Sequence, residues 1–512
     1  PQDPGGYFII NGSEKVIISQ ECVAPNKVLV FESSKKSTKY SDVVEIKATP
    51  NNKFTTPKSI SIKITTKETL NGRCLRAFIP NMKKEIPIFI LFRALNIISD
   101  KDIVRHIIND IDDINNKKAL SLLKGSVIEG GWIKTQKEAI EYISEFVNFI
   151  GHPREIKLTD KKKYNYIIKL FKNDLLPNVG PSFKKKAYFL GHMINRLLMC
   201  VLKRTDYDDR DSYINKRINL PGVLLANLFR QYFSKFVKDM RNSIMKELNT
   251  GLWKSSKRYD KIISETNIYK IMKSTTIESG IKYSMATGNW GIKTNSANNR
   301  VGVAQVCSRL SFFGMLSHLR RVNTPTEKSS KIIPPRKLHN TQWGIICPAE
   351  TPEGGAVGLV KNIALGCHIT IGTNAEIIYM CLEKMNDIIK LDECSLENSF
   401  KMNKIFINGD WCYLTNSISD IYHQLISLRR KAIINIYTSI CWSRTLREIH
   451  IYTDGGRCMR PLYIVDNNKL RISKEDITKL RNKEYTWNNL LLKSINTKSG
   501  ITKSYDINNT YE

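Results

Sequence analysis

The sequence lacks any hydrophobic run long enough to cross a bilayer. Its longest apolar stretches cover residues 87–92 and 197–202, and the cationic residues Arg93 and Lys203 follow them directly. A membrane-spanning helix needs roughly 18 or more predominantly apolar residues in a row. We therefore predict no transmembrane segment and no membrane partner.

Closely spaced cysteine pairs are also missing. The eleven cysteines occur singly, as at Cys22, Cys200 and Cys458, and no C-x-x-C pair is present. Such a pair is the usual start of a structural zinc site or a dithiol redox motif. The pattern favours a reducing compartment with free, mostly structural thiols, and predicts no metal site. The sequence opens on Pro1, without methionine or a signal peptide, so we expect a fragment that begins inside a longer protein.

Acidic residues are scarce relative to basic ones. The 512 residues include 80 Lys and Arg against 48 Asp and Glu, which gives a formal net charge of +32. So large an excess repels itself unless a polyanion neutralises it, which points to nucleic acid. An AT-rich genome, which enriches Lys, Ile and Asn, is an alternative source of part of the excess. The length predicts about three or four domains.

Turn and periodicity signals predict a mixture of strands and helices. Asn-Gly pairs at residues 11–12 and 408–409 stand between β-rich runs and predict hairpins, because both residues tolerate positive φ. Residues 40–80 alternate as half-exposed strands do, whereas apolar residues at helical spacing mark other segments. The predicted helical segments cover residues 101–123, 136–150, 224–248 and 418–433.

Two parts of the chain have a less regular texture. Between residues 286 and 361, Gly, Asn, Thr, Ser and Pro alternate with Arg and with large apolar residues, as in an irregular segment that builds a site. Further on, residues 449–452 and 462–465 flank a TDGGR turn at 453–457 and predict strands in a β-rich module. The predicted fold class is multidomain α+β.

Cations gather in residues 281–340, where ten Lys and Arg face Glu327 as the one acidic residue. Lys and Arg bind phosphates with release of counterions and hold a nucleic acid without reading its sequence. An ordinary solvated basic face is the alternative interpretation of such a run.

This stretch also carries a series of motifs in a fixed order, and they continue just beyond it. They are ATGNWG at 286–291, RVGVAQV at 300–306, LSHLRRVNTP at 316–325, PRKLHN at 335–340, CPAETPEG at 347–354 and GLVKN at 358–362. The series resembles the fork of the second-largest, beta-like subunit of multisubunit DNA-directed RNA polymerases.

The resemblance extends over almost the whole chain. GGYFIINGSEK at 5–15 is similar to the family's protrusion, and the motifs IPIF at 86–89 and FRAL at 92–95 are similar to its lobe. FLGHMINRLL at 189–198 and DDRD at 208–211 continue the lobe. TDGGR at 453–457, Arg460-Pro461 and EYTW at 484–487 resemble its external domains.

The resemblance implies a domain plan and a function. We expect a mixed helical lobe and protrusion, an irregular fork and β-rich external domains. The implied boundaries are 1–30 and 216–280 for the protrusion, 31–215 for the lobe, 281–360 for the fork and 361–512 for the external domains. The implied function is that of an RNA polymerase subunit that holds template DNA, the RNA–DNA hybrid and downstream DNA beside the active centre.

Residues that match the family's functional positions follow from the same resemblance. Those expected to contact nucleic acid are Arg300, Gln305, Arg320, Arg321, Lys328, Lys331 and Lys337. Guanidinium groups grip phosphate in bidentate fashion. Arg336, Glu350 and Glu353 match positions near the catalytic centre, where a carboxylate orients an arginine or a mobile loop rather than a metal; a structural ion pair is the alternative. We assign His318 to packing.

Two departures from cellular relatives bear on the source. The fork loops at 292–299 and 326–333 lack the Gly and Arg content of those relatives, and the chain is rich in Ile, Lys and Asn. Both features look like the polymerase of a large DNA virus. We expect an intracellular protein, in the virion and the host cytoplasm if viral and otherwise in the nucleus.

No carboxylate cluster fit for nucleotidyl transfer is visible in the sequence. Residues 110–113 have the form D-x-D-D but are interpreted as a solvated helical face, and 208–211 as an ion-paired turn. In the family the largest subunit holds the catalytic aspartates and Mg²⁺, and zinc is expected only in a C-terminal part beyond Glu512. The predicted partners are that subunit, smaller subunits, template DNA, nascent RNA and nucleoside triphosphates, and the fragment should be inactive alone.

Two alternatives from other classes stay open. A pure nucleic-acid-binding protein would act without a polymerase partner. An assembly scaffold would dock partners through residues 224–248 and the C-terminal module, and would tolerate charge reversal at Arg300, Arg321 and Arg336.

Overall fold

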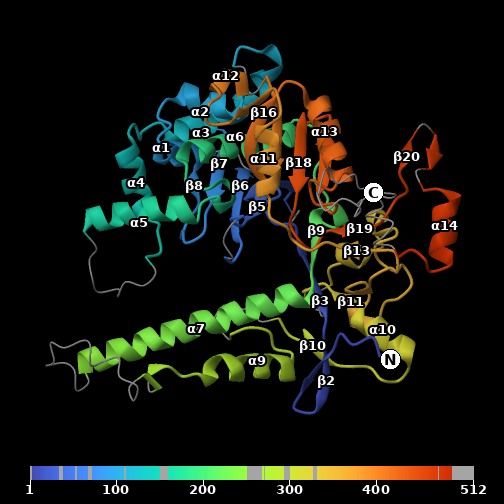
Figure 1. Cartoon of the computed structure of the whole chain (residues 1–512). Coiled ribbons are helices and arrows are strands. Elements are labelled where there is room, and N and C mark those ends of the chain that lie inside the picture. Colours follow the sequence, from blue (N-terminus) through green and yellow to red (C-terminus); the bar gives the residue numbers. More distant parts are fainter. Residues whose placement is uncertain are drawn as a thin grey trace. The chain divides into compact units, whose positions relative to one another are not determined.

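The computed structural model describes residues 3–33, 39–51, 55–66, 72–108, 111–149, 159–250, 268–269, 271–292, 300–326, 331–399, 401–466, 468–470 and 472–486. The chain divides into two compact units, each built from separate stretches of sequence (Figure 1). The first unit contains residues 1–22, 211–371 and 455–461. The second contains residues 23–210, 372–454 and 462–512.

The first unit starts with the predicted hairpin. Strands β1 (Phe8–Ile10) and β2 (Ser13–Ile17) pair antiparallel, and Asn11 and Gly12 turn the chain with φ of 52° and 75°. Strand β10 (Ala304–Val306) completes this sheet against β2. A second sheet has the order β12-β11-β3-β9, with bounds Val360–Asn362, Arg321–Asn323, Ser19–Val23 and Lys216–Asn219. Segments far apart in sequence therefore meet in the sheets of this unit.

Two helices of the first unit lie side by side (Figure 1). The predicted helix at 224–248 is confirmed as α7 (Pro221–Thr250), which begins at the proline, as proline fits the first helical turn. It packs on α9 (Thr275–Thr287) where Gly280 meets Tyr232; a Cβ on Gly280 would lie 2.2 Å from that ring. The other elements of this unit are α10 (Phe312–Leu319), β13 (His368–Ile369), β19 (Cys458–Met459) and the short 3-10 helices η3 (Tyr213–Asn215), η5 (Pro334–Arg336), η6 (Asn340–Gln342) and η7 (Gly354–Ala356).

The second unit contains two five-stranded sheets. The first has the order β4-β5-β6-β7-β8, with bounds Leu29–Glu32, Tyr40–Ala48, Lys58–Thr65, Leu75–Phe78 and Ile86–Pro87. Burial alternates along β5, which confirms the strands predicted within residues 40–80. The helices α1 (Ile88–Ala94), α2 (Asp100–Ile107), α3 (Lys117–Gly130), α4 (Gln136–Ser144), α5 (Asp160–Asn173) and α6 (Phe183–Val201) accompany this sheet.

The other sheet of the second unit has the order β14-β16-β15-β18-β17. Its strands are Ile388–Lys390, Asp410–Thr415, Asn403–Ile407, Glu448–Tyr452 and Ser439–Ser443. The predicted Asn-Gly hairpin joins β15 to β16, with Asn408 and Gly409 at positive φ. Helix α13 (Ile418–Arg430) confirms the helix predicted at 418–433, and α11 (Glu376–Glu383), α12 (Leu396–Ser399), α14 (Lys474–Arg481), β20 (Val465–Asp466) and β21 (Lys469–Leu470) complete the unit.

Three details differ from the sequence expectations. The segment 101–123 is not one helix: after α2 the chain passes through the 3-10 helix η1 (Ile114–Asn116), which Asp113 caps by accepting from Asn115 N at 2.9 Å. Asp113 therefore lies between helices, and Asp110 falls outside the described residues. Residues 449–452 lie in β18 as predicted, whereas of residues 462–465 only Val465 belongs to a strand, β20, which pairs with β21.

The DDRD sequence forms ion pairs, as predicted, but with residues outside the motif. Asp208 pairs with Arg196 at 3.2 Å and accepts from Val30 N, while Arg210 pairs with Glu45 at 3.2 Å. Asp208, Arg210 and all of these partners belong to the second unit. Across the described residues, no helix combines the length and the apolar character that a bilayer span requires.

Candidate nucleic-acid interface

The segment that follows Arg300 is built from short elements joined to the N-terminal strands. Gln305 of β10 pairs with Val16 of β2, and Val322 of β11 pairs with Ser19 of β3. Between them Ser311 caps α10, because its side chain accepts from Gly314 N at 3.0 Å. This framework gives the basic residues fixed backbone positions although the segment contains little regular structure.

A buried histidine fixes Gln305. His318 is 4% exposed, and its Nδ1 accepts from Ser308 N at 3.2 Å, so Nε2 carries the proton and donates to Gln305 Oε1 at 3.1 Å. Burial, with a smaller contribution from the charge of Arg321, lowers the pKa of His318. A neutral, doubly hydrogen-bonded ring confirms the packing role predicted for His318. Gln305 also donates to Gly302 O at 3.1 Å, so its amide is held within the segment.

Two of the predicted arginines hold the backbone. Arg320 donates to Ala364 O at 2.7 Å and to Ile363 O at 3.4 Å. Arg336 donates to Gly355 O at 2.7 Å and to Val357 O at 3.0 Å, beside a glycine, Gly358, whose added Cβ would lie 2.3 Å from Arg336 O. Both guanidinium groups donate to carbonyl oxygens that are not paired within a helix or sheet. The two arginines therefore stabilise the local backbone.

The side chains of Arg300 and Arg321 make fewer identified hydrogen bonds than those of Arg320 and Arg336. Arg321 lies on β11, opposite Asn362 of β12, and its Nε is buried without a hydrogen-bond partner among the described residues. The backbone of Arg300 pairs with Trp290, which accounts for its position but leaves its side chain half-buried. The buried Nε of Arg321 is out of reach of an acceptor from outside the chain, so a phosphate contact is open only to guanidinium nitrogens that reach the surface.

Two predicted lysines are exposed. The side chains of Lys331 and Lys337 stand on either side of η5, and neither ammonium has an ion-pair partner in the part of the chain that the structure describes. The third, Lys328, lies outside the described residues. Exposed lysines without carboxylates beside them are free to exchange counterions for phosphates.

The predicted carboxylates are both at the surface. Glu350 is exposed and accepts a hydrogen bond from Ser317 Oγ of α10. Glu353 is exposed at the start of η7 and makes no capping bond with its side chain. These positions leave both groups accessible, and the irregular segment 351–358 that Glu353 belongs to is the one that Arg336 holds.

A buried charge cluster lies under this surface, and sequence reasoning missed it. Glu21 of β3 accepts from Lys361 Nζ at 2.9 Å, from Tyr213 OH at 3.1 Å and from Thr324 Oγ1 at 3.2 Å, and it also pairs with Lys216. The cluster therefore connects β3, β9 and β12 of one sheet, and Thr324 joins it from just beyond the end of β11. The only sign of the cluster in the sequence is that charged residues interrupt β-like runs. That sign cannot be interpreted until folding brings four distant segments together.

The electrostatics of the cluster follow from burial and pairing. Burial by itself would raise the pKa of Glu21, but the charges of Lys361 and Lys216 outweigh it and the pKa is lowered. Burial lowers the pKa of Lys361, against the opposing effect of Glu21. Burial, followed by the Glu21 charge, raises the pKa of Tyr213. The carboxylate is thus ionised at neutral pH and acts as the common acceptor of the cluster.

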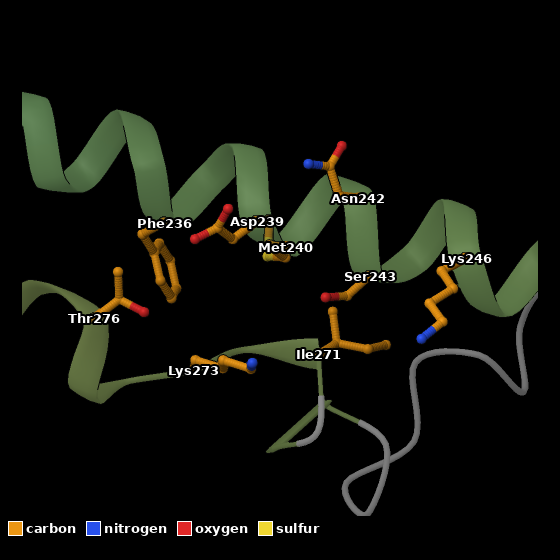
Figure 2. Close-up of a pocket in the computed structure, with 9 residues that line it drawn as sticks. All are labelled: Phe236, Asp239, Met240, Asn242, Ser243, Lys246, Ile271, Lys273 and Thr276. Carbon is orange, nitrogen blue, oxygen red and sulfur yellow. The ribbon is translucent and has the colours of Figure 1, made fainter. Parts of the chain in front are cut away.

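A separate hollow of about 340 Å³ lies between α7 and the chain before α9 (Figure 2). Its lining is mixed, with Phe236, Asp239, Met240, Asn242, Ser243, Lys246, Ile271, Lys273 and Thr276. Asp239 is its single carboxyl group, and none of the predicted site residues lines it. Nowhere in the described residues do three or more His, Cys, Asp or Glu side chains gather as a metal-binding group, so no donor set for Mg²⁺ or zinc is assigned to them.

Comparisons with known proteins bear on this arrangement. Three family models match in order: RNA polymerase Rpb2 domain 2 at residues 24–219, domain 3 at 305–369 and domain 4 at 405–466. The three models describe successive domains of one class of protein, a subunit of RNA polymerase, and the fold is multidomain α+β. The chain belongs to the Rpb2 family, the second-largest subunits of multisubunit RNA polymerases.

Individual relatives agree with the family models. The chain is 40% identical over 504 residues to DNA-directed RNA polymerase II subunit 2 of Arabidopsis thaliana, a match that covers 96% of this chain and 40% of that protein. It is 39% identical to RNA polymerase II subunit RPB2 of Encephalitozoon cuniculi, over 96% and 41%. It is 33% identical to RNA polymerase subunit Rpo2 of Sulfolobus acidocaldarius, again over 96% and 41%. The chain spans about 40% of the length of these curated relatives.

Proposed function

We propose that this chain is part of a DNA-dependent RNA polymerase, in which it holds template DNA, the RNA–DNA hybrid and downstream DNA beside an active centre that the largest subunit builds. This proposal rests on the match of three Rpb2 domain models, in order, along one chain. The chain is also 40% identical to a polymerase subunit. The nucleotidyl transfer reaction belongs to the whole enzyme.

The geometry of the first unit supports a division of labour among its cations. Arg320 and Arg336 donate to backbone carbonyls and shape the segment. Lys331 and Lys337 are exposed, and the side chains of Arg300 and Arg321 are partly exposed. We assign phosphate contacts to this second group, since the first group already has acceptors.

Partners, metal and domain names follow from the same proposal. The largest subunit supplies the catalytic carboxylates and Mg²⁺, and zinc belongs to a C-terminal part of the family's chains that lies outside this sequence. Residues 1–30 and 216–280 form the protrusion, 31–215 the lobe, 281–360 the fork and 361–512 the external domains. The protein acts inside the cell, in the nucleus or, with a viral source, in the virion and host cytoplasm.

The test is a polymerase reconstituted with the full-length subunit carrying Arg300→Ala, Lys331→Ala and Lys337→Ala. These three residues avoid the carbonyl-binding arginines, so the fold stays intact. Binding to a template–hybrid scaffold should weaken, and the slope of log K against log salt concentration should become shallower by about one for each phosphate contact removed. Elongation should slow in parallel.

Lys161→Ala with Lys162→Ala, on the exposed face of α5, serves as the matched control for charge removal. It should leave elongation at the parental rate. If the triple variant loses nucleic-acid affinity but elongates normally, the chain is a binding protein without a role in the reaction. If both readouts stay unchanged, an assembly scaffold is the better description.

A further inference from the structure

Two cysteines that are far apart in the sequence meet within the first unit. Cys458 lies on β19, directly opposite Ile369 of β13 in the antiparallel pair. Cys367 lies two residues before Ile369. Side chains two residues apart on an extended chain share a face, so Cys367 and Cys458 are diagonal neighbours on one face of this ribbon.

The backbone around the two cysteines holds this register. Thr370 N donates to Arg457 O at 3.0 Å, and Gly456 N donates to Thr370 O at 2.8 Å. On the other side, Cys367 N donates to Ala364 O at 3.0 Å. The ribbon therefore stays paired at the place where the chain leaves the first unit after Ile371 and returns at Gly455.

The chemical environment makes the two thiols unequal. Cys367 Sγ donates to His368 O at 3.8 Å. The neighbouring Cys458 thiol, with the charge of Arg320, lowers the pKa of Cys367. The Cys367 thiol, together with burial, raises the pKa of Cys458. Both residues are partly exposed. A thiol of lowered pKa beside a thiol of raised pKa is the arrangement of an attacking and a resolving cysteine.

We propose that Cys367 and Cys458 form a reversible disulfide that links β13 to β19, a modification site specific to a chain that carries both cysteines. Diagonal positions on paired strands lie about 7 to 8 Å apart, beyond the usual Cα separation of a disulfide, so the two strands must move closer by about 1 Å for the bond to form. A bond strained in this way is one that cellular thiols reduce readily. The inference rests on strand pairing within the first unit and is independent of the proposed function.

The reaction balances with a low-molecular-weight disulfide such as glutathione disulfide as oxidant. The Cys367 thiolate attacks one sulfur of the oxidant, forms a mixed disulfide and releases one glutathione thiolate. Cys458 then loses its proton to solvent and its sulfur attacks Cys367 Sγ, which releases the second glutathione. The two cysteines lose two electrons together, and the oxidant takes up both.

The experiment exposes the full-length protein to buffers with graded ratios of reduced to oxidised glutathione. Free thiols are then blocked by alkylation, and the digested protein is analysed by mass spectrometry. A cross-linked peptide joining Cys367 to Cys458 should accumulate as the buffer becomes oxidising and disappear with dithiothreitol. Hydrogen exchange at the amides of β13 and β19 should slow in the oxidised protein.

Variants separate this reaction from general thiol oxidation. In Cys458→Ser, Cys367 should stop at the mixed disulfide with glutathione, whereas Cys441→Ser, which removes an exposed cysteine elsewhere, should cross-link like the parent. The proposal is wrong if the parent protein, in oxidising buffer, carries glutathione or alkyl groups separately on the two cysteines. It is equally wrong if Cys367 pairs with a different cysteine.

Discussion

Helix α1 of the second unit and the segment from Arg300 to Asn362 of the first unit are stabilised in opposite ways. Every residue of α1 is buried, in an apolar core that includes Phe89, Phe92 and Leu190. In the other segment Leu310, Phe313 and Trp343 are 97%, 80% and 78% exposed. There the fold depends on arginines that donate to carbonyls and on the Glu21 cluster below. A surface held by polar contacts can keep large side chains available for partners.

The largest expected effect lies in the apolar core. Phe89→Ala should lower the local unfolding free energy of the second unit by about 3–5 kcal/mol, because it removes a fully buried ring and leaves a cavity. Phe313→Ala should change stability by no more than about 0.5 kcal/mol, as a surface substitution does. Native-state hydrogen exchange on the assembled protein measures both. Equal effects would erase the contrast between the two regions.

The buried charge cluster should come next. Glu21→Gln removes the carboxylate that pairs with Lys361 and leaves Lys216 with only its longer pair to Asp211, at 3.6 Å, so it should destabilise the β12-β11-β3-β9 sheet by about 3 kcal/mol. Glu14→Gln, which breaks an exposed pair with Arg309, is the control and should change exchange little. A protected sheet in the Glu21 variant would show that the cluster is not needed.

Alanine substitutions at two glycines of the segment from Arg300 to Asn362 should have smaller effects on stability. Gly354 and Gly358 both have φ near +70°, at 75° and 71°, but only at Gly358 would a Cβ meet backbone, namely Arg336 O. Gly354→Ala should cost about 1 kcal/mol from backbone strain alone. Gly358→Ala should cost at least about 2 kcal/mol and release the Arg336 contacts, which would appear as faster exchange at residues 354–358.

The smallest expected effect is a pH dependence. The pKa of Glu21 is lowered in the fold relative to its ordinary value of 4.5, so the unfolded state binds the proton more tightly. Its contribution to stability is therefore complete above about pH 4.5 and is lost as the pH falls through the lowered value. A melting temperature followed from pH 6 to pH 3 should fall less in Glu21→Gln than in the parent. Parallel curves for the two proteins would contradict the assignment.

The sequence was informative where the determinants were local. Both Asn-Gly hairpins, the body of helix α7 over residues 224–248 and the alternating strand β5 were predictable, because turn residues and periodicity act within one element. The prediction failed at 101–123, where Asp113 caps a 3-10 helix within a helical pattern, and at 462–464, which precede the strand β20. Partner choice between strands depends on distant segments, which periodicity does not encode.

The same division applies to the site. The concentration of cations in residues 281–340 and the order of the motifs are properties of the sequence, and they were enough to name the family that the comparisons support. Which arginine donates to carbonyls and which lysine stays exposed was decided by tertiary structure, as Arg320, Arg336 and Lys331 illustrate. The sign of a side chain's charge follows from the residue type alone. Whether that side chain is available to a binding partner depends on which acceptors folding places within hydrogen-bonding distance.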